Sequence, residues 1–325
     1  MKKTMLAVAA AISALHAGGA QSQTAAGFPV RPVRIVVPAT AGGNNDLVAR
    51  SLAQQITEGL GQQVIVENRP SASGLLSAQF VARSAPDGYT LLHGANTFAV
   101  APSILSNAGY DPLKDFTGVT LTCLVPKVLD VNPALPVRSV KELIALAKAR
   151  PGAISYGTAG VGGTGHMAAE LFNSQAGTKM LHVPYKGNSQ AIVDVVGGQI
   201  MLMFDEISTS LPYIRSGRLR ALAVTSRKRS PLFPDVPTID ESALPGFEDI
   251  TFTGLMAPAG TPREILARWR NEVAKAVIAP DLHKRFLDLG VELTASASPD
   301  EFTAFIKQEF EKKARIARQA GIKME

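Results

Sequence analysis

The chain has 325 residues, 46% of them hydrophobic and 18% charged, which is typical of a globular protein whose length suits about two domains. Its formal net charge is +6, but the basic residues are dispersed and none of the basic stretches is interleaved with aromatic residues, so nucleic-acid binding is not expected. The single cysteine, Cys123, excludes an intramolecular disulfide framework, and its apolar neighbours predict a buried structural thiol.

The N-terminal segment has the organisation of a secretory signal. A basic start, Lys2-Lys3, is followed by the apolar stretch Met5–Leu15 and the small residues Gly18-Gly19-Ala20. The apolar stretch is too short for a membrane span, and the absence of a following cysteine argues against a lipid-anchored lipoprotein. We therefore expect residues 1–20 to be a signal peptide and the rest of the chain to be periplasmic.

The segment that follows Arg34 predicts a strand, a glycine-rich turn and a helix in succession. Ile35–Val37 is a β-branched run suited to a strand, which Pro38 ends, and Gly42-Gly43 permits a turn. A helix that starts there aims unpaired N–H groups and its positive dipole end at one place, which is an anion site. Because the turn lacks the Lys-Ser/Thr pair of a P-loop, a carboxylate is expected rather than a triphosphate. The expected cap is Asn44, Asn45 or Asp46, and the apolar helical positions are Leu47, Val48, Leu52 and Ile56.

Strand and helix patterns alternate along most of the chain, which predicts an α/β protein with mainly parallel sheets. Two stretches, Val119–Val131 and Phe252–Met256, suit strands that cross between two lobes. Further strands are expected at residues 64–67, 89–92, 154–156, 181–184, 201–204 and 219–224, and helices at 47–60, 75–84, 140–149, 190–197, 262–279, 282–289 and 299–320.

A second glycine-rich loop, Gly157–Gly165, follows one of these strands. Within it, Gly160–Gly165 matches the dinucleotide-binding fingerprint, which needs an acidic residue about 20 positions further on to hold a ribose. The region Leu181–Lys186 offers no acid there, so we expect no cofactor. An anion-binding turn before a helix that starts near His166 explains the same glycines, and glycines that only permit close packing are the alternative.

The sequence contains no constellation for catalysis or metal binding. Neither a Gly-x-Ser-x-Gly elbow nor His-Glu-x-x-His occurs, and the histidines have no cysteine or acidic partner at metal-ligand spacing. We therefore expect no metal and no enzyme activity, which argues against a secreted hydrolase.

A few single residues remain as candidates for binding or packing. His166, beside the glycine-rich loop, can donate a hydrogen bond to a ligand, whereas His93 and His182 suit satisfied core positions in or after strands. Asp205 follows an apolar strand, where α/β folds place ligand groups, and it either contacts the ligand or caps the next segment. Trp269 lies on an amphipathic helix, which predicts packing rather than recognition.

Motifs in a fixed order connect the chain with a known family. It resembles the Bug or TctC family, the periplasmic solute receptors of tripartite tricarboxylate transporters, over essentially the whole sequence after the signal. The motifs are Arg34-Ile-Val-Val-Pro38 with Gly42-Gly43 and Asp46, Gly61-Gln62, Val66-Glu-Asn-Arg-Pro70, Pro86-Asp-Gly-Tyr-Thr-Leu-Leu92, Tyr156-Gly-Thr-Ala-Gly-Val-Gly162, Val183-Pro-Tyr-Lys-Gly187 and Leu211–Thr225.

The resemblance implies a two-lobed periplasmic binding protein of the Venus flytrap, type II-like kind, with a mainly parallel sheet flanked by helices in each lobe. Lobe 1 would comprise residues 28–125 and 253–325, and lobe 2 residues 126–252. Such a receptor is expected to be a monomer that closes on a small di- or tricarboxylate and delivers it to membrane transporter subunits. Docking of the loaded receptor on a sensor kinase is the alternative, because both roles use ligand-driven closure.

The resemblance also implies that the carboxylate is held by the first strand–helix loop and by the glycine-rich loop of the second lobe. Relatives have an aromatic residue and a second proline in the first loop, where this chain has Ala39 and Ala41. The smaller residues predict a roomier pocket that admits an aromatic dicarboxylate, unless Phe98 or Leu76 fills the space. The expected ligand-binding residues are Ala39, Gly43, Asn44, Asn45, Ser73, Asn96, Thr158, Gly160, Gly162, Thr164, His166 and Asp205.

Overall fold

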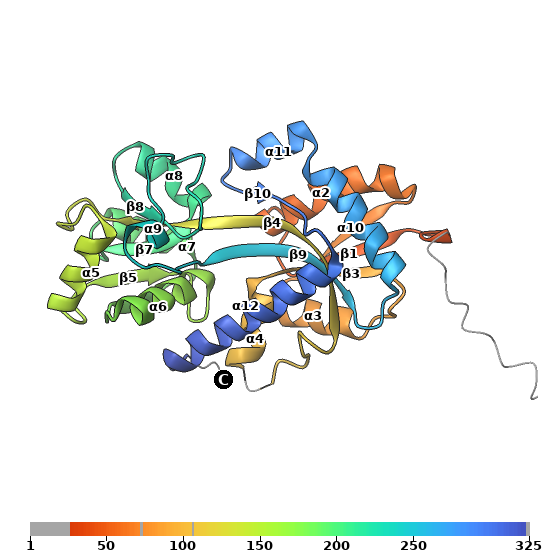
Figure 1. Cartoon of the computed structure of the whole chain (residues 1–325), viewed down its shortest axis with the longest axis horizontal. Helices are drawn as coiled ribbons and strands as arrows, with labels where there is room; N and C mark the ends of the chain where they lie inside the picture. The colour runs from red at the N-terminus through yellow and green to blue at the C-terminus, as the bar shows by residue number, and fades with distance from the viewer. Residues whose placement is uncertain (1–26, 72–73, 106, 323–325) are drawn as a thin grey trace, which may run out of the picture.

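Two long strands run between the two lobes of the molecule and join them (Figure 1). They are β4 (Phe116–Val131) and β9 (Ile250–Pro258), which pair with each other in antiparallel register. They confirm the two crossings expected from the sequence. The computed structural model describes residues 27–71, 74–105 and 107–322, so the predicted signal at residues 1–20 and the predicted ligand residue Ser73 lie outside the described part. Within the described ranges no helix is both long enough and apolar enough to cross a membrane.

Lobe 1 is built on three parallel strands beside the crossing strands. The order β2-β1-β3-β9-β4 places β1 (Val33–Val37) between β2 (Val64–Asn68) and β3 (Thr90–Ala95), and β3 pairs with β9 antiparallel. Four of the five residues of β1 are buried, as expected for a β-branched strand covered on both faces. The helices of this lobe are α2 (Asn44–Leu60), α3 (Leu75–Ala82), α4 (Asn96–Ile104), α10 (Arg263–Val277) and α11 (Pro280–Leu287), and β10 (Glu292–Leu293) pairs with β4.

Lobe 2 repeats the same principle at the other end of the crossing strands (Figure 1). Its central strand β5 (Ser155–Thr158) is parallel to β6 (Leu181–Pro184) and β7 (Leu202–Glu206), while β7 and β8 (Arg220–Val224) pair with β4 antiparallel. The helices are α5 (Val140–Ala149), α6 (Thr164–Ala176), α7 (Asn188–Val196), α8 (Ile207–Arg215) and α9 (Ile239–Ser242). The predicted two-lobed α/β fold, with parallel strands at the heart of each lobe, is confirmed.

The cores of the two lobes use the residues that the sequence marks as apolar. Trp269 of α10 is fully buried in the core of lobe 1, and its indole N–H donates to the carbonyl of Gly88 at 3.0 Å. Cys123 is buried in the same cluster, and burial raises the pKa of its thiol to about 11. A thiol that stays protonated is a poor nucleophile, so the expected structural roles of both residues agree with their positions.

The C-terminal helix α12 (Pro299–Gln319) lies along both lobes. Phe302 and Ile306, near its start, pack with lobe 1 residues such as Phe116. Ile316 and Ala317, near its end, pack in the core cluster of lobe 2. The predicted domain boundaries assign the whole of α12 to lobe 1, whereas its last turns contribute to the lobe 2 core.

Candidate functional site

The two glycine-rich loops each end in a helix that begins without a side-chain cap. Gly43 is the N-cap of α2 and Gly163 is the N-cap of α6, both with an extended backbone and no side-chain hydrogen bond to the helix. The sequence expectation that Asn44, Asn45 or Asp46 caps α2 is therefore wrong, because these residues already belong to its first turn. First-turn N–H groups have no acceptor within their own helix and lie at the positive end of its dipole, so each helix start can bind an anion.

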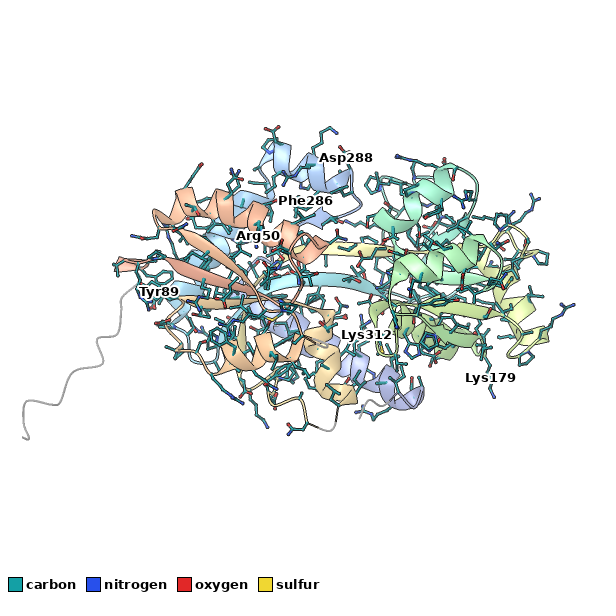
Figure 2. The ribbon with its side chains drawn as sticks, turned by 180° about the vertical axis from the view of Figure 1, so that it is seen from behind. Arg50, Tyr89, Lys179, Phe286, Asp288 and Lys312 are labelled. Atoms are coloured by element: carbon teal, nitrogen blue, oxygen red, sulfur yellow. The ribbon has the colours of Figure 1, made fainter. Side chains whose placement is uncertain are left out.

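Asp46 shapes the first loop from inside the helix. Its carboxylate is 2% exposed and accepts hydrogen bonds from the Gly42 N–H at 2.8 Å and the Asn68 side chain at 2.8 Å. Arg50, labelled in Figure 2, pairs with the same carboxylate at 3.0 Å. Burial raises the pKa of Asp46, but these hydrogen bonds together hold it below its usual value. The carboxylate is thus ionised and fixes the turn that delivers α2 to the cleft.

Asn44, the first residue of α2, reaches across to the other lobe. Its side-chain amide donates to a carboxylate oxygen of Glu206 at 3.0 Å, and Glu206 is the N-cap residue of α8. The start of α2 in lobe 1 therefore faces the end of β7 in lobe 2. This places the first loop opposite the carboxyl edge of the second sheet, where α/β folds place their ligands.

The side chain of Asn45 turns inward instead. Its Oδ1 accepts a hydrogen bond from Nδ1 of His93, which is fully buried. Burial lowers the pKa of His93 to about 3, so the neutral ring donates at Nδ1 and accepts at Nε2 from the Thr122 hydroxyl, 2.8 Å away. His93 is the satisfied core histidine expected from the sequence. It fixes Asn45, whose backbone N–H remains the group predicted to bind the ligand.

The second loop is held by a histidine that belongs to the helix it precedes. The Gly162 N–H donates to Nδ1 of His166 at 3.0 Å, so this amide is engaged inside the loop. Burial and the neighbouring His182 lower the pKa of His166 to about 4, which leaves the ring neutral. Since Nδ1 accepts this hydrogen bond, the neutral ring carries its one proton on Nε2. His166 therefore has one remaining donor, as the predicted role in ligand binding requires.

Thr158 and His182 complete the support of this loop. The rings of His166 and His182 stack with centroids 3.8 Å apart at 11°. Nε2 of His182 lies 2.7 Å from the hydroxyl of Thr158, which also accepts the Gly160 N–H at 3.2 Å. Thr158 is buried and its hydroxyl is used within the loop, although it stays among the predicted ligand residues. The stack does not follow from local sequence patterns, because His166 lies on α6 and His182 on β6, where it pairs with Tyr156 of β5.

Asp205 lies at the end of β7 in a buried acidic group that the sequence analysis missed. The Asn188 side chain donates to it at 2.6 Å, and Ser210 of α8 donates to the neighbouring Asp130 at 2.5 Å. Burial raises the pKa of Asp205 to about 7, and burial together with Asp205 raises that of Asp130. The sequence left two roles open for Asp205, contacting the ligand or capping the next segment. Asp205 does not cap α8, because the N-cap residue of α8 is Glu206 and the helix start has no side-chain cap bond.

The remaining predicted residues have varied surroundings. Asn96 is buried, and its side chain bonds the backbone of β9 at Ile250 and Phe252. Ala39 packs against the lobe 1 core. Thr164 is the first residue of α6, Gly43 and Gly163 precede the two helices, and Gly160 adopts a positive φ of 127°. Of the two residues expected to fill the space beside Ala39, Phe98 packs on Tyr110 and Phe116, and Leu76 is 61% exposed.

A cavity of about 200 Å³ lies between the second loop and α4. One wall comes from lobe 1 and the other from lobe 2. The lining residues are Thr97, Val100, Ala101 and Ile104 of α4, and Ala159, Val161, Gly162 and Gly163 of the loop. The cavity thus touches the residue that caps α6.

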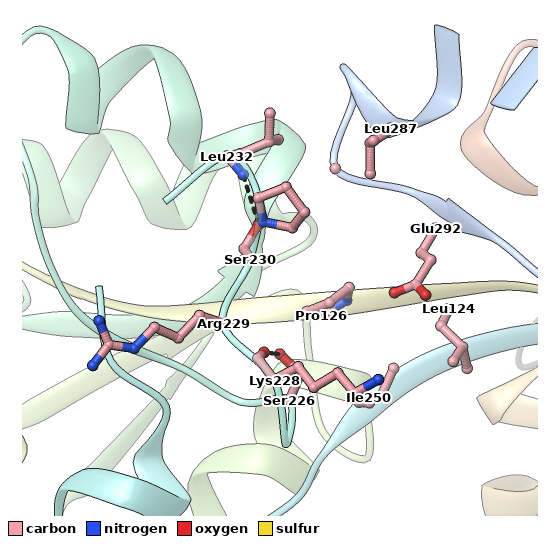
Figure 3. A pocket seen from close by; sticks show the side chains of 12 residues that line it. Leu124, Pro126, Ser226, Lys228, Arg229, Ser230, Leu232, Ile250, Leu287 and Glu292 are labelled. Atoms are coloured by element: carbon pink, nitrogen blue, oxygen red, sulfur yellow. Dashed lines mark hydrogen bonds between the residues drawn. The ribbon is translucent and has the colours of Figure 1, made fainter. Parts of the chain in front are cut away.

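A second pocket, shown in Figure 3, lies beside the crossing strands. It has a volume of about 60 Å³ and is lined by Leu124 and Pro126 of β4, Ile250 of β9, residues 226 and 228–232, and Leu287, Gly290 and Glu292. Among the described helices, none begins at this pocket. The pocket therefore lacks the free backbone N–H groups that the two glycine-rich loops provide. In the described part of the chain no group of three or more His, Cys, Asp or Glu side chains could hold a metal ion.

The chain is similar to known solute receptors. The tripartite tricarboxylate transporter family receptor (TctC) matches residues 48–322. Protein BugT of Bordetella pertussis is 36% identical over 326 residues, which cover 100% of this chain and 100% of that protein. The structure of R. palustris Rpa4515 with adipate is 35% identical with a TM-score of 0.76, covering 91% of this chain and 99% of that one. The structure of MatC (Rpa3494) from Rhodopseudomonas palustris with bound malate is 33% identical with a TM-score of 0.72, covering 89% and 99%. This chain therefore belongs to the TctC, or Bug, family of solute-binding receptors.

Proposed function

We propose that this protein is a periplasmic receptor that binds a small organic carboxylate between its two lobes and delivers it to a tripartite membrane transporter. It acts as a binding protein and not as an enzyme. The observation that carries the proposal is the pair of uncapped helix starts, α2 in lobe 1 and α6 in lobe 2, each preceded by glycines. Two such sites on facing lobes can hold one carboxylate ligand between them. The bound adipate and malate of the two similar structures support the same ligand class.

Closure would follow from the way the lobes are joined. The chain passes from one predicted lobe to the other in the two crossing strands, β4 and β9. The predicted lobes are residues 28–125 with 253–325, and residues 126–252. A ligand that contacts both helix starts binds the closed arrangement better than the open one, so it shifts the population towards closure. The contact between Asn44 and Glu206 supports the closed arrangement from the protein side.

Titration calorimetry of the exported protein against mono-, di- and tricarboxylates tests the ligand class. We expect at least one acid to bind with a 1:1 stoichiometry and to reduce the radius of gyration measured by X-ray scattering. Matched amides of the same acids, which lack the charge, are the control and should bind far more weakly. Failure of every organic acid to bind would overturn the proposal.

A further inference from the structure

We propose that the cavity between α4 and the second loop receives an apolar body attached to the carboxylate, so that the preferred ligand is an aryl or branched monocarboxylate. The inference rests on the proposed function and names the ligand class within it. The cavity volume is about 200 Å³. An apolar cavity of roughly 150 Å³ in another protein accommodates benzene, so a ring fits here.

The lobe 1 wall of the cavity is one face of α4. Thr97, Val100, Ala101 and Ile104 have the spacing that brings side chains to the same side of a helix. Val100 and Ile104 are more than nine-tenths buried and belong to the core cluster of lobe 2, although α4 follows β3 in lobe 1. The face therefore looks across the boundary between the lobes, and a ligand there would contact both.

The lobe 2 wall is formed by the loop that ends at the start of α6. Gly162 and Gly163 have no side chain, and Val161 and Ala159 add only small apolar groups. Gly163 is the N-cap of α6, so a carboxylate at the free N–H groups of this helix lies next to the cavity. A ligand can then bind its charge at the helix and direct its body into the cavity.

The cavity lining carries no ionisable side chain. Its only side-chain polar group is the hydroxyl of Thr97. The lining side chains therefore offer a second carboxylate no charged partner, so burying it here costs free energy. An apolar group gains from the same desolvation. The sequence analysis placed the room for a larger ligand beside Ala39, but Ala39 packs against the lobe 1 core. We therefore place the room for the ligand's apolar body beside α4.

The test is a calorimetric series of acetate, butyrate, phenylacetate and succinate with the exported protein. If the cavity takes the body, affinity should rise by about fourfold for each additional buried methylene group from acetate to butyrate. Phenylacetate should bind most tightly, and succinate more weakly than butyrate. If acetate or succinate binds as tightly as phenylacetate, the cavity assignment is wrong while the carboxylate receptor stands. If none of these or other organic acids binds, the proposed function itself fails.

Two filling variants and one control locate the effect. Ala101→Leu fills the cavity from α4, and Val161→Phe fills it from an exposed loop position, 44% exposed in the structure. Each should weaken phenylacetate at least tenfold and leave acetate within twofold. If Ala101→Leu fails to fold, Val161→Phe still decides the question. The control is Val30→Phe, at a 66% exposed position next to β1, which should change neither affinity. Equal effects on both ligands, or none from Val161→Phe, would overturn the inference.

Discussion

The side-chain amide of Asn44 donates a 3.0 Å hydrogen bond to the carboxylate of Glu206, and this bond joins the start of α2 in lobe 1 to the start of α8 in lobe 2. The two residues are 162 positions apart in sequence. Any motion that opens the lobes between these two loops breaks the bond. It therefore stabilises the closed arrangement from the protein side.

Removal of this bond should speed ligand release. The acceptor is a carboxylate, but the bond is exposed to solvent, so we expect the net contribution of an ordinary hydrogen bond, about 0.5–1.5 kcal/mol, or roughly 2- to 10-fold in an equilibrium. We expect Asn44→Ala to raise the dissociation rate of a bound carboxylate within that range, with little change in association rate. Stopped-flow displacement of a bound fluorescent carboxylate by excess unlabelled ligand measures this rate. Asn271→Ala, on the exposed surface of α10, is the matched control, and an unchanged dissociation rate for Asn44→Ala would contradict the role.

Stability should fall as pH rises from about 4 to about 7 because of Asp205. Burial first, and then the charge of Glu206, raise the pKa of Asp205 from 3.8 to about 7 against the opposing effect of Lys127. Between these values the folded protein binds a proton that the unfolded chain has lost, so the free energy of unfolding decreases with pH. Asp130, whose pKa is also raised, acts in the same direction.

The variant Asp205→Asn should flatten this dependence. The effect in the wild-type protein amounts to at most about 4 kcal/mol over the interval. Melting temperature measured from pH 4 to 8 should therefore decline less steeply in Asp205→Asn than in the wild-type protein. Asp235→Asn, at an exposed position, provides the control. An equally steep decline in both proteins would show that Asp205 is ionised throughout the interval and would contradict the prediction.

A buried group of three charges stabilises the junction of the lobes. Asp249, which precedes β9, accepts hydrogen bonds from Lys127 of β4 at 2.7 Å and from Lys313 of α12, and all three side chains are at most 1% exposed. Asp249→Asn leaves two buried ammonium groups without a counter-charge and should cost about 3–5 kcal/mol of unfolding free energy. Lys313→Met leaves a neutral pair and should cost less. Urea unfolding measures the loss of unfolding free energy in each variant. A larger loss in Lys313→Met than in Asp249→Asn would contradict the prediction.

The sequence predicts the elements of this fold better than the bonds between them. The Ile35–Val37 strand, the glycine turns and the crossing strands follow from local patterns, because β-branched runs and glycines constrain the backbone directly. The cap of α2 does not follow: the sequence favours Asn44, Asn45 or Asp46, yet Asn44 and Asn45 bond to Glu206 and His93. The two asparagine side chains, which local propensity would place on the helix N–H groups, thus bond to residues distant in sequence instead.

The support of the second loop is also hidden in the sequence. His166 on α6 stacks on His182 of β6, which lies beside Tyr156 because β5 and β6 pair in parallel. Registers between strands depend on packing of the whole sheet, so no local window of sequence contains them. The acidic group at Asp205 and Asp130 arises in the same way, from the pairing of β4 with β7. For such sites the sequence names single residues, and the fold supplies their partners.

The central claim, that backbone amides at the two helix starts hold the carboxylate, is tested most directly by the affinity of Thr164→Pro measured by calorimetry. Proline suits the first position of a helix but has no N–H, and the extended backbone of Gly163 accommodates it. Thr164→Ala controls for the lost side chain, and Arg263→Pro, at the start of α10, controls for a proline elsewhere. We predict that Thr164→Pro weakens carboxylate binding by about 10- to 150-fold, the contribution of one hydrogen bond to a charged group, while both controls bind nearly as the wild type. Wild-type affinity in a folded Thr164→Pro protein would contradict the claim.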